Sequence, residues 1–316
     1  MCKDGGKWSQ LKQSISDDNK ELTDLWMVGA KNRNAALEKG IYTWGQKECT
    51  PEILGISSRK TKPILESILR VNRSKDILLS PPVITNNEMG WNTPGDVEFF
   101  IDFESHNGAL SSIKNVHAVR TQNIIYMLGV GFIHPETKEW TYRDFTSNLI
   151  TYAEEKRICT EFVEYIQKVS KKYRTSRPKC YHWSNAEPSM WGDVIERHPT
   201  LFYDAWIWID MLRIFKQTPI TIRGCKSFSL KDVAKSMKKL NLIHTIWTTK
   251  CASGKTAMIG AYNSHRLALQ KGGSMKAVPL FKEIITYNEV DVKVLYEILT
   301  HLREHHLPKN KRAKHK

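Results

Sequence analysis

Two carboxylates in this sequence have the type and spacing needed to bind a metal ion. Asp102 and Glu104 lie two residues apart in segment 96–105, where aromatic and β-branched residues alternate with acids. This alternation predicts a β-strand, and both side chains then project from one face near its C-terminal end. Neighbouring like charges are costly unless something positive lies between them. A divalent metal site and a solvent-exposed edge strand both explain this segment taken alone.

A second pair of side chains with chemical potential comes near the end of the chain. Tyr287 and Asp291 are four residues apart in a helix expected from about Leu280 to Arg303. Residues four apart share one face of a helix, so both side chains can point into the same site.

A further acid is placed where a strand gives way to a helix. Glu187 follows the predicted strand 179–183 and a break at Ser184-Asn185, and it lies at the start of the next helix. An acid at this position also favours the helix dipole, which is the simpler interpretation. Asp210, at the end of another predicted strand, is the alternative as a fourth acid.

The elements between these residues predict an α/β domain after a break near 80–87. Strands 96–105, 124–132 and 140–145 have connections too short for a crossover helix, which predicts an antiparallel meander. The elements expected after them are a helix over 150–172, a strand over 179–183, a helix from about 186, a strand ending near 210, a helix over 229–237, and an irregular segment over 248–276.

The chain before this domain is expected to be helical over 21–80, after a flexible segment 1–20. Gly29 is expected to make a tight turn between two helices, the second of which ends at Gly40. This resembles a helix-hairpin-helix element, whose turn offers backbone N–H groups to a phosphate. Gly29, Lys31 and Arg33 would then contact nucleic acid, and a bundle that only packs is the alternative. A basic helix is expected from Ser57 to Arg73.

The overall composition points to a polyanionic partner. The 316-residue chain carries a net charge of +15, with a pI of about 9.4, which favours nucleic acid first and an anionic membrane second. Its six cysteines show no CxxC spacing, which argues against a zinc ribbon. No signal peptide and no apolar run of about 18 residues is recognisable. We therefore expect a soluble, intracellular protein, cytoplasmic or, given the basic and disordered tail 306–316, nuclear.

The order of the acids carries a family resemblance. An Asp-x-Glu strand, an acid after a strand-loop-helix, and Tyr-x-x-x-Asp together resemble the DEDD superfamily of 3′–5′ exonucleases in its tyrosine-bearing branch. More closely, four segments resemble the RNase H-like exonuclease domain that follows a RecB-like nuclease domain in many microbial proteins and also occurs in large DNA viruses. These segments are 100–104, 181–188, 229–234 and 287–291.

The resemblance implies a fold and a domain organisation. It covers roughly residues 95–305, and we place the domain at 90–305. The implied fold is an RNase H-like mixed five-stranded sheet flanked by helices, preceded here by a small all-α domain. No RecB-like nuclease domain is recognisable in the sequence.

The resemblance also implies a function and its site. The chain would be a two-metal-dependent 3′–5′ exonuclease that hydrolyses DNA or RNA at single-stranded ends, and a catalytically inactive nucleic-acid-binding subunit of the same fold is the alternative. Tyr287 would orient the attacking water, and four acids would bind two Mg²⁺ or Mn²⁺ ions: Asp102, Glu104, Glu187 and Asp291. Glu187 stands where most of the superfamily has aspartate. His182 and Trp183 would line the substrate, and a packed role for His182 is the alternative.

Overall fold

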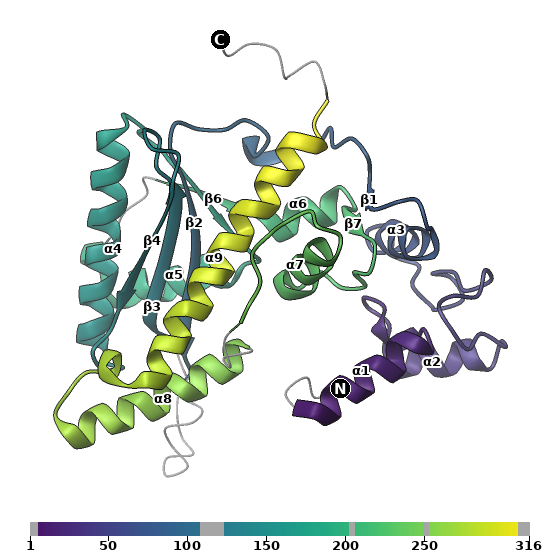
Figure 1. Ribbon diagram of the computed structural model, residues 1–316, viewed down its shortest axis with the longest axis horizontal. Coiled ribbons are helices and arrows are strands. Elements are labelled where there is room, and N and C mark those ends of the chain that lie inside the picture. Colours follow the sequence, from purple (N-terminus) through teal and green to yellow (C-terminus); the bar gives the residue numbers. More distant parts are fainter. Residues whose placement is uncertain (1–5, 108–122, 202–205, 249–252, 309–316) are drawn as a thin grey trace. The chain divides into compact units, whose positions relative to one another are not determined.

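The computed structural model, shown in Figure 1, describes residues 6–107, 123–201, 206–248 and 253–308. The chain divides into two compact units. We call the first, which holds all of the candidate acids, the sheet unit, and it consists of Asn87–Met211 and Thr245–Leu299. The second is called the N-terminal unit, and it consists of Met1–Asn86, Leu212–His244 and Thr300–Lys316.

The sheet unit is built on a five-stranded mixed sheet in the order β4-β3-β2-β5-β6. Strands β2, β3 and β4 form the predicted antiparallel meander, and β5 and β6 run parallel to β2. The strands are β2 (Glu98–His106), β3 (Ile124–Ile133), β4 (Trp140–Thr146), β5 (Lys179–His182) and β6 (Ile207–Asp210). The expected α/β class is confirmed, and the acid-bearing strand β2 lies in the middle of the sheet. The arrangement is compatible with an RNase H-like fold.

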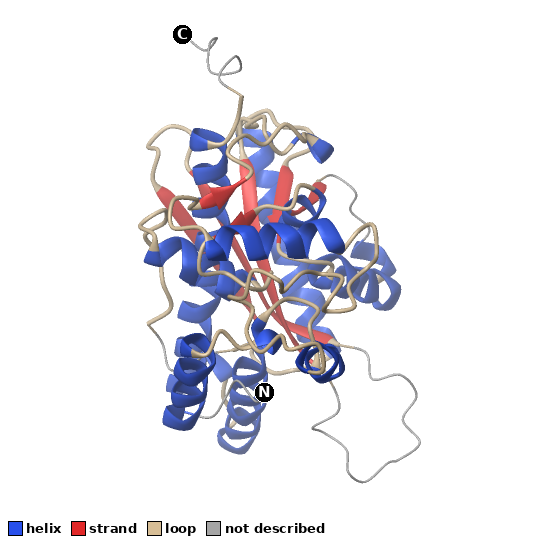
Figure 2. Ribbon diagram, turned by 90° about the vertical axis from the view of Figure 1, so that its right-hand side faces the viewer, coloured by secondary structure: helices blue, strands red, loops and turns tan. Residues whose placement is uncertain are grey.

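Helices cover both faces of this sheet (Figures 1 and 2). Helices α4 (Tyr152–Lys172) and α5 (Ala186–Arg197) pack on one face, while α8 (Gly254–Lys271) and α9 (Pro279–His305) pack on the other. Alternate residues of the acid-bearing strand, Phe99, Ile101 and Phe103, are buried in the α4/α5 core together with Val97, which directly precedes the strand. A shift of the strand register by one residue would expose all of these apolar side chains, so their burial fixes the register. In this register Asp102 and Glu104 point to the α8/α9 face. Short 3₁₀ turns lie at Glu88–Gly90, Pro199–Leu201 and Met275–Ala277.

Helix α8 corrects our expectation of an irregular segment over 248–276. The helix is capped by the Ser253 hydroxyl, which accepts the Thr256 N–H at 3.2 Å, and it ends at Gly272 in the left-handed conformation. A Cβ added at Gly260 would lie 3.2 Å from the Ile284 side chain of α9, so small residues permit this close packing. The pattern was missed because the buried face carries small residues: Ala257, Gly260, Ala261, Ser264 and Ala268.

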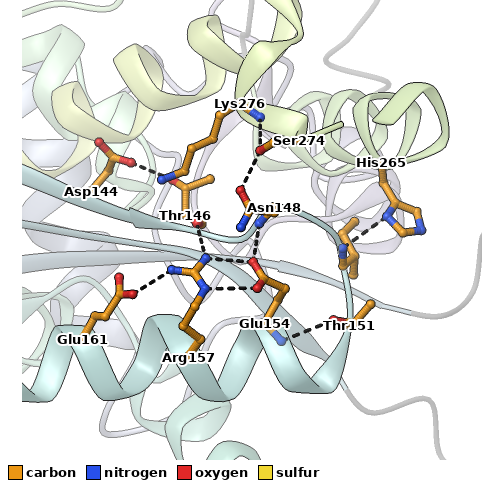
Figure 3. A network of polar contacts seen from close by, with 11 residues as sticks. Asp144, Thr146, Asn148, Thr151, Glu154, Arg157, Glu161, His265, Ser274 and Lys276 are labelled. Carbon is orange, nitrogen blue, oxygen red and sulfur yellow. Dashed lines mark hydrogen bonds and ion pairs between the residues drawn. The ribbon is translucent and has the colours of Figure 1, made fainter. Parts of the chain in front are cut away.

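A polar network attaches the end of β4 to the start of α4 and to the region of α8 (Figure 3). Arg157 donates to the Thr146 carbonyl at 3.0 Å and forms ion pairs with Glu154 and Glu161, each at 2.8 Å. His265 of α8 accepts the backbone N–H of Ile150 at 3.2 Å. The Arg157 contacts therefore join β4 to α4, and the His265 hydrogen bond ties α8 to the segment before α4.

The N-terminal unit contains more than the expected helical domain. Its strand β1 (Leu79–Ser80) pairs antiparallel with β7 (Thr221–Ile222), which comes more than a hundred residues later in the sequence. A small all-α N-terminal domain is therefore not shown. The helices are α1 (Gly6–Asp18), α2 (Ala30–Leu37), α3 (Lys62–Arg73), α6 (Met211–Gln217, from the unit boundary) and α7 (Leu230–Lys239).

Several local predictions in this unit need adjustment. Helix α1 occupies most of the segment 1–20 that we expected to be flexible. The expected basic helix begins at Lys62 instead of Ser57, with Pro63 in its first turn. The predicted helix over 229–237 is present as α7, capped by the Ser229 hydroxyl. Most of the basic tail, residues 309–316, lies outside the described residues. Among the helices that are described, none has the length and apolar character to cross a membrane.

The expected helix-hairpin-helix element is not formed. Between the end of α1 at Asp18 and Gly29 there is only a three-residue 3₁₀ turn, Leu22–Asp24, and Met27 adopts a positive φ of 67°. The backbone is extended here because the Trp26 N–H donates to the Lys226 carbonyl at 2.8 Å, while Leu22 and Leu25 are buried. Packing within the unit therefore overrides the local helical pattern.

The most buried charge of the sheet unit predicts a large stability effect. Glu155 is 0% exposed, accepts the Ile125 N–H at 2.7 Å, and contacts Arg197 and His198 at 2.6 and 3.1 Å. Glu155→Ala leaves a buried guanidinium without its partner, so we expect the free energy of unfolding to fall by about 3–5 kcal/mol in urea titrations. Glu161→Ala, which breaks an exposed ion pair, is the control and should cost no more than about 0.5 kcal/mol. Similar losses for both variants would contradict this account.

Candidate metal centre

Three carboxylates converge on the α8/α9 face of the sheet. One oxygen from each of Asp102, Glu104 and Asp291 lies within 4.8 Å of the other two. Glu104 and Asp291 are buried and Asp102 is partly exposed. Three negative charges at this separation repel one another strongly, and more so where water is excluded. The group could hold a metal ion, which would relieve this repulsion.

Asp102 is held in place by the last helix. The Asn288 side chain of α9 donates to Asp102 Oδ2 at 2.6 Å and reaches the Asp102 carbonyl at 3.2 Å. Its own oxygen accepts the Tyr142 hydroxyl of β4 at 2.8 Å. Burial, followed by the charges of Asp144 and Asp102, raises the pKa of Tyr142 well above its usual value, so the hydroxyl remains a donor. The chain of donors orients the Asp102 carboxylate before any ligand arrives.

Gly129 provides the space that this arrangement needs. Gly129 pairs with Asp102 across β2 and β3, and with Asp144 across β3 and β4. A Cβ added there would lie 1.7 Å from Asn288 Oδ1 and 3.1 Å from the Tyr142 hydroxyl. Only glycine therefore lets α9 place its amide against the central strand.

The other two carboxylates also have neutral donors nearby. Trp247 Nε1 donates to Asp291 Oδ1 at 3.0 Å, and the Tyr126 hydroxyl lies 3.5 Å from Glu104 Oε2. Tyr126 reaches this position because the β2–β3 register shifts between Glu104 and Ser105. Such a bulge re-aims side chains beside a site, and here it turns Tyr126 toward the acids.

Tyr287 lies one helical turn before Asp291, as the spacing predicted. Its side chain is only 4% exposed and is hydrogen-bonded to the Asp291 side chain. Burial, and then the charges of Asp291, Glu104 and Asp102, raise the pKa of Tyr287 far above its usual value. The hydroxyl is therefore protonated at neutral pH and can act as a hydrogen-bond donor beside the acids.

Glu187 does not join the carboxylate group among the described residues. The residue is 4% exposed, and its Oε2 lies 3.5 Å from His182 Nδ1 without a hydrogen-bond partner in the part of the chain that the structure describes. Burial is the main cause of a raised pKa for Glu187, with His182 opposing it. Asp210, the alternative, accepts the Ser184 N–H at 2.9 Å and is also outside the group.

His182 is packed in the interior, as one of the two interpretations of this residue predicted. It is 2% exposed, donates from Nδ1 to the Ser184 carbonyl at 2.6 Å, and packs edge-on against Trp208. Trp183, the next residue, is partly exposed at the end of β5.

The predicted phosphate-binding residues of the N-terminal unit are arranged differently from our expectation. The Gly29 N–H donates to Asn32 Oδ1 at 3.0 Å and so caps α2 instead of remaining available. The Arg33 guanidinium forms an ion pair with Glu21 at 2.8 Å, and Lys31 is exposed. These contacts give the turn a structural role.

Sequence reasoning missed several residues of the site. Asn288 lies within segment 287–291, which carries the family resemblance. An asparagine at this position gave no indication that its side chain would contact Asp102. Two features of the sequence could have pointed to the site. Gly129 interrupts an apolar strand, and such a glycine often marks the close approach of another group. His106 lies two residues after Glu104, on the strand face expected for Asp102 and Glu104. The His106 ring stacks on Tyr262 of α8 with ring centroids 5.4 Å apart, and among the described residues its Nε2 has no hydrogen-bond partner.

The chemistry of the donors limits which metal the group would accept. All three ligands are carboxylate oxygens, and no cysteine or histidine belongs to the group among the described residues. Oxygen-only sets favour hard cations such as Mg²⁺, Mn²⁺ and Ca²⁺ over zinc or copper. The residues present therefore fit a hard divalent cation.

Comparison of the chain with protein-family models, with curated proteins and with solved structures gives no match. Interpretation of the site therefore depends on its own geometry.

The contact between Gly129 and Asn288 can be tested directly. Gly129→Ala would displace the Asn288 amide from Asp102, and loss of such a supporting contact lowers metal affinity by about 10–100-fold. We expect this weakening of Mn²⁺ binding in isothermal titration calorimetry, together with overpacking of about 1–3 kcal/mol in unfolding experiments. Gly192→Ala is the matched control, because a Cβ there meets nothing within 4 Å. Unchanged Mn²⁺ affinity in Gly129→Ala would show that Asn288 does not position the site.

Proposed function

We propose that the chain is a divalent-metal-dependent 3′–5′ exonuclease that hydrolyses phosphodiester bonds of DNA or RNA. The observation that carries the proposal is the convergence of Asp102, Glu104 and Asp291, with the Tyr287 hydroxyl next to them. Two strand carboxylates, one helix carboxylate and a tyrosine four residues before it are the combination that the family resemblance implies. The exonuclease polarity rests on that resemblance alone.

The residues present suit this chemistry. Two Mg²⁺ or Mn²⁺ ions at such a site would stabilise the charge that develops on the attacking and leaving oxygens during hydrolysis. The three carboxylates would hold the cations, and the Asn288 and Trp247 side chains would keep Asp102 and Asp291 oriented. Glu187 or Asp210 would complete the set after a movement of its side chain.

Tyr287 would position the water that attacks the phosphodiester. In the absence of a cation, burial and the neighbouring carboxylates raise the pKa of Tyr287, so its hydroxyl is protonated at neutral pH. A neutral hydroxyl beside the carboxylates can still hold a water molecule in line, which is a contribution of orientation. The net charge of +15 supports a nucleic-acid substrate, held mainly through its phosphates.

The proposal predicts that Asp102→Asn abolishes nuclease activity. Asparagine keeps the size of the side chain but removes the charge that attracts the cation, so end-labelled DNA and RNA oligonucleotides should persist with either Mg²⁺ or Mn²⁺. Asp193→Asn, on α5 and outside the carboxylate group, should cut like the wild type. Binding of the wild type to oligonucleotides without turnover in any metal would instead favour the non-catalytic nucleic-acid-binding subunit.

The role of the tyrosine has its own prediction. Tyr287→Phe retains the buried ring and removes only the hydroxyl, so we expect kcat to fall by about 100-fold from lost orientation. Mn²⁺ affinity, measured by calorimetry, should change less than about threefold, because the tyrosine is not one of the three grouped carboxylates. Full turnover by Tyr287→Phe would remove the tyrosine from the mechanism.

A further inference from the structure

A cavity of about 460 Å³ lies within the N-terminal unit, and none of its lining residues belongs to the carboxylate group. Its volume falls in the range of about 300–1,000 Å³ that small-molecule sites occupy. Half of its lining is apolar: Ile77, Leu78, Leu79, Pro82 and Leu242. Apolar side chains of this kind can pack against the face of a planar ring.

Two imidazoles form another part of the lining. His301, in the last turns of α9, and His306, just after that helix, lie with their ring centroids 5.4 Å apart. The Nδ1–H of His306 donates to the Pro82 carbonyl at 3.1 Å, which fixes the orientation of that ring. Burial, and then the neighbouring histidines, lower the pKa of His301 to about 4. Both rings can stack on a base or hydrogen-bond to its edge.

A guanidinium stands at the same cavity without a carboxylate partner. Arg70, in the last turn of α3, donates one N–H to the Ser80 hydroxyl. No acid among the described residues forms an ion pair with Arg70, and this includes Asp76, which also lines the cavity. The remaining N–H donors have the fork geometry that suits a phosphate.

We propose that this cavity binds a nucleotide unit. The base would contact the apolar side chains and the two imidazoles of the lining, and the phosphate would contact Arg70. Stacking of bases on flat side chains and phosphate contacts from arginine are the usual means by which proteins hold unpaired nucleotides. The Asp76 carboxylate can accept a hydrogen bond from a sugar hydroxyl or a base amino group. The site is independent of the carboxylate group and of hydrolysis.

The nucleotide can come from two sources, a free mononucleotide or an unpaired position of a strand. Calorimetry on the full chain with EDTA should therefore compare four probes: 2′-deoxyadenosine 5′-monophosphate, 2′-deoxyadenosine, inorganic phosphate and a short oligodeoxyadenylate. We expect the mononucleotide to bind at least tenfold more tightly than the nucleoside or inorganic phosphate. Tighter binding of the oligonucleotide identifies a strand as the source, and equal binding identifies the free nucleotide. Inorganic phosphate that binds as tightly as the mononucleotide would overturn the proposal, because the base would then contribute nothing.

Variants separate the two halves of the ligand. Arg70→Met should reduce mononucleotide affinity to that of the nucleoside while nucleoside affinity stays the same, and His301→Leu should weaken both at least fivefold. Arg59→Met, an exposed arginine of the same unit outside the cavity, is the control and should bind like the wild type. Should Arg70→Met fail to fold by circular dichroism, Arg70→Lys serves instead, with an intermediate loss confined to the mononucleotide. Equal mononucleotide affinity of the wild type and the folded Arg70 variant overturns the proposal. Because no cation is present and no cleavage is measured, these results do not depend on the exonuclease proposal.

Discussion

The repulsion among three carboxylates is the constraint on which the sheet unit depends. Asp102, Glu104 and Asp291 lie within 4.8 Å of one another on a largely buried face. At such a separation, each pair of unit charges costs several kcal/mol at the effective dielectric of a protein surface, and more where water is excluded. Such a group persists only if rigid elements hold it, so the core on the opposite face of β2 and the packing of α9 are conditions for the site.

The position of α9 depends on two glycines and an amide. Gly129 leaves room for Asn288 to reach Asp102, and Gly131 leaves room for Trp140 and Val292, whose atoms would lie 2.2 and 2.9 Å from an added Cβ. The helix can therefore approach the middle of the sheet closely enough for Asp291 to meet Asp102 and Glu104. A larger side chain at either glycine would force the helix outward and separate the acids.

Prediction from the sequence succeeded where one periodicity dominated. The alternation over 96–105 gave the central strand and the face of its acids, and the four-residue spacing of Tyr287 and Asp291 gave their shared helical face. It failed where tertiary contacts decide. The small-residue face of α8 has no strong apolar pattern, and the turn at Gly29 is shaped by a hydrogen bond to Lys226, far away in the chain. Glu187 illustrates the same limit. It lies at the start of the helix after β5, as expected, but its carboxylate points toward His182.

That orientation of Glu187 has a physical reason. A fourth ionised carboxylate beside the other three would add repulsion, whereas in its observed position burial raises the pKa of Glu187 and favours the neutral acid. The neutral form needs no counter-charge, and the nearest nitrogen, His182 Nδ1 at 3.5 Å, already donates its proton to the Ser184 carbonyl.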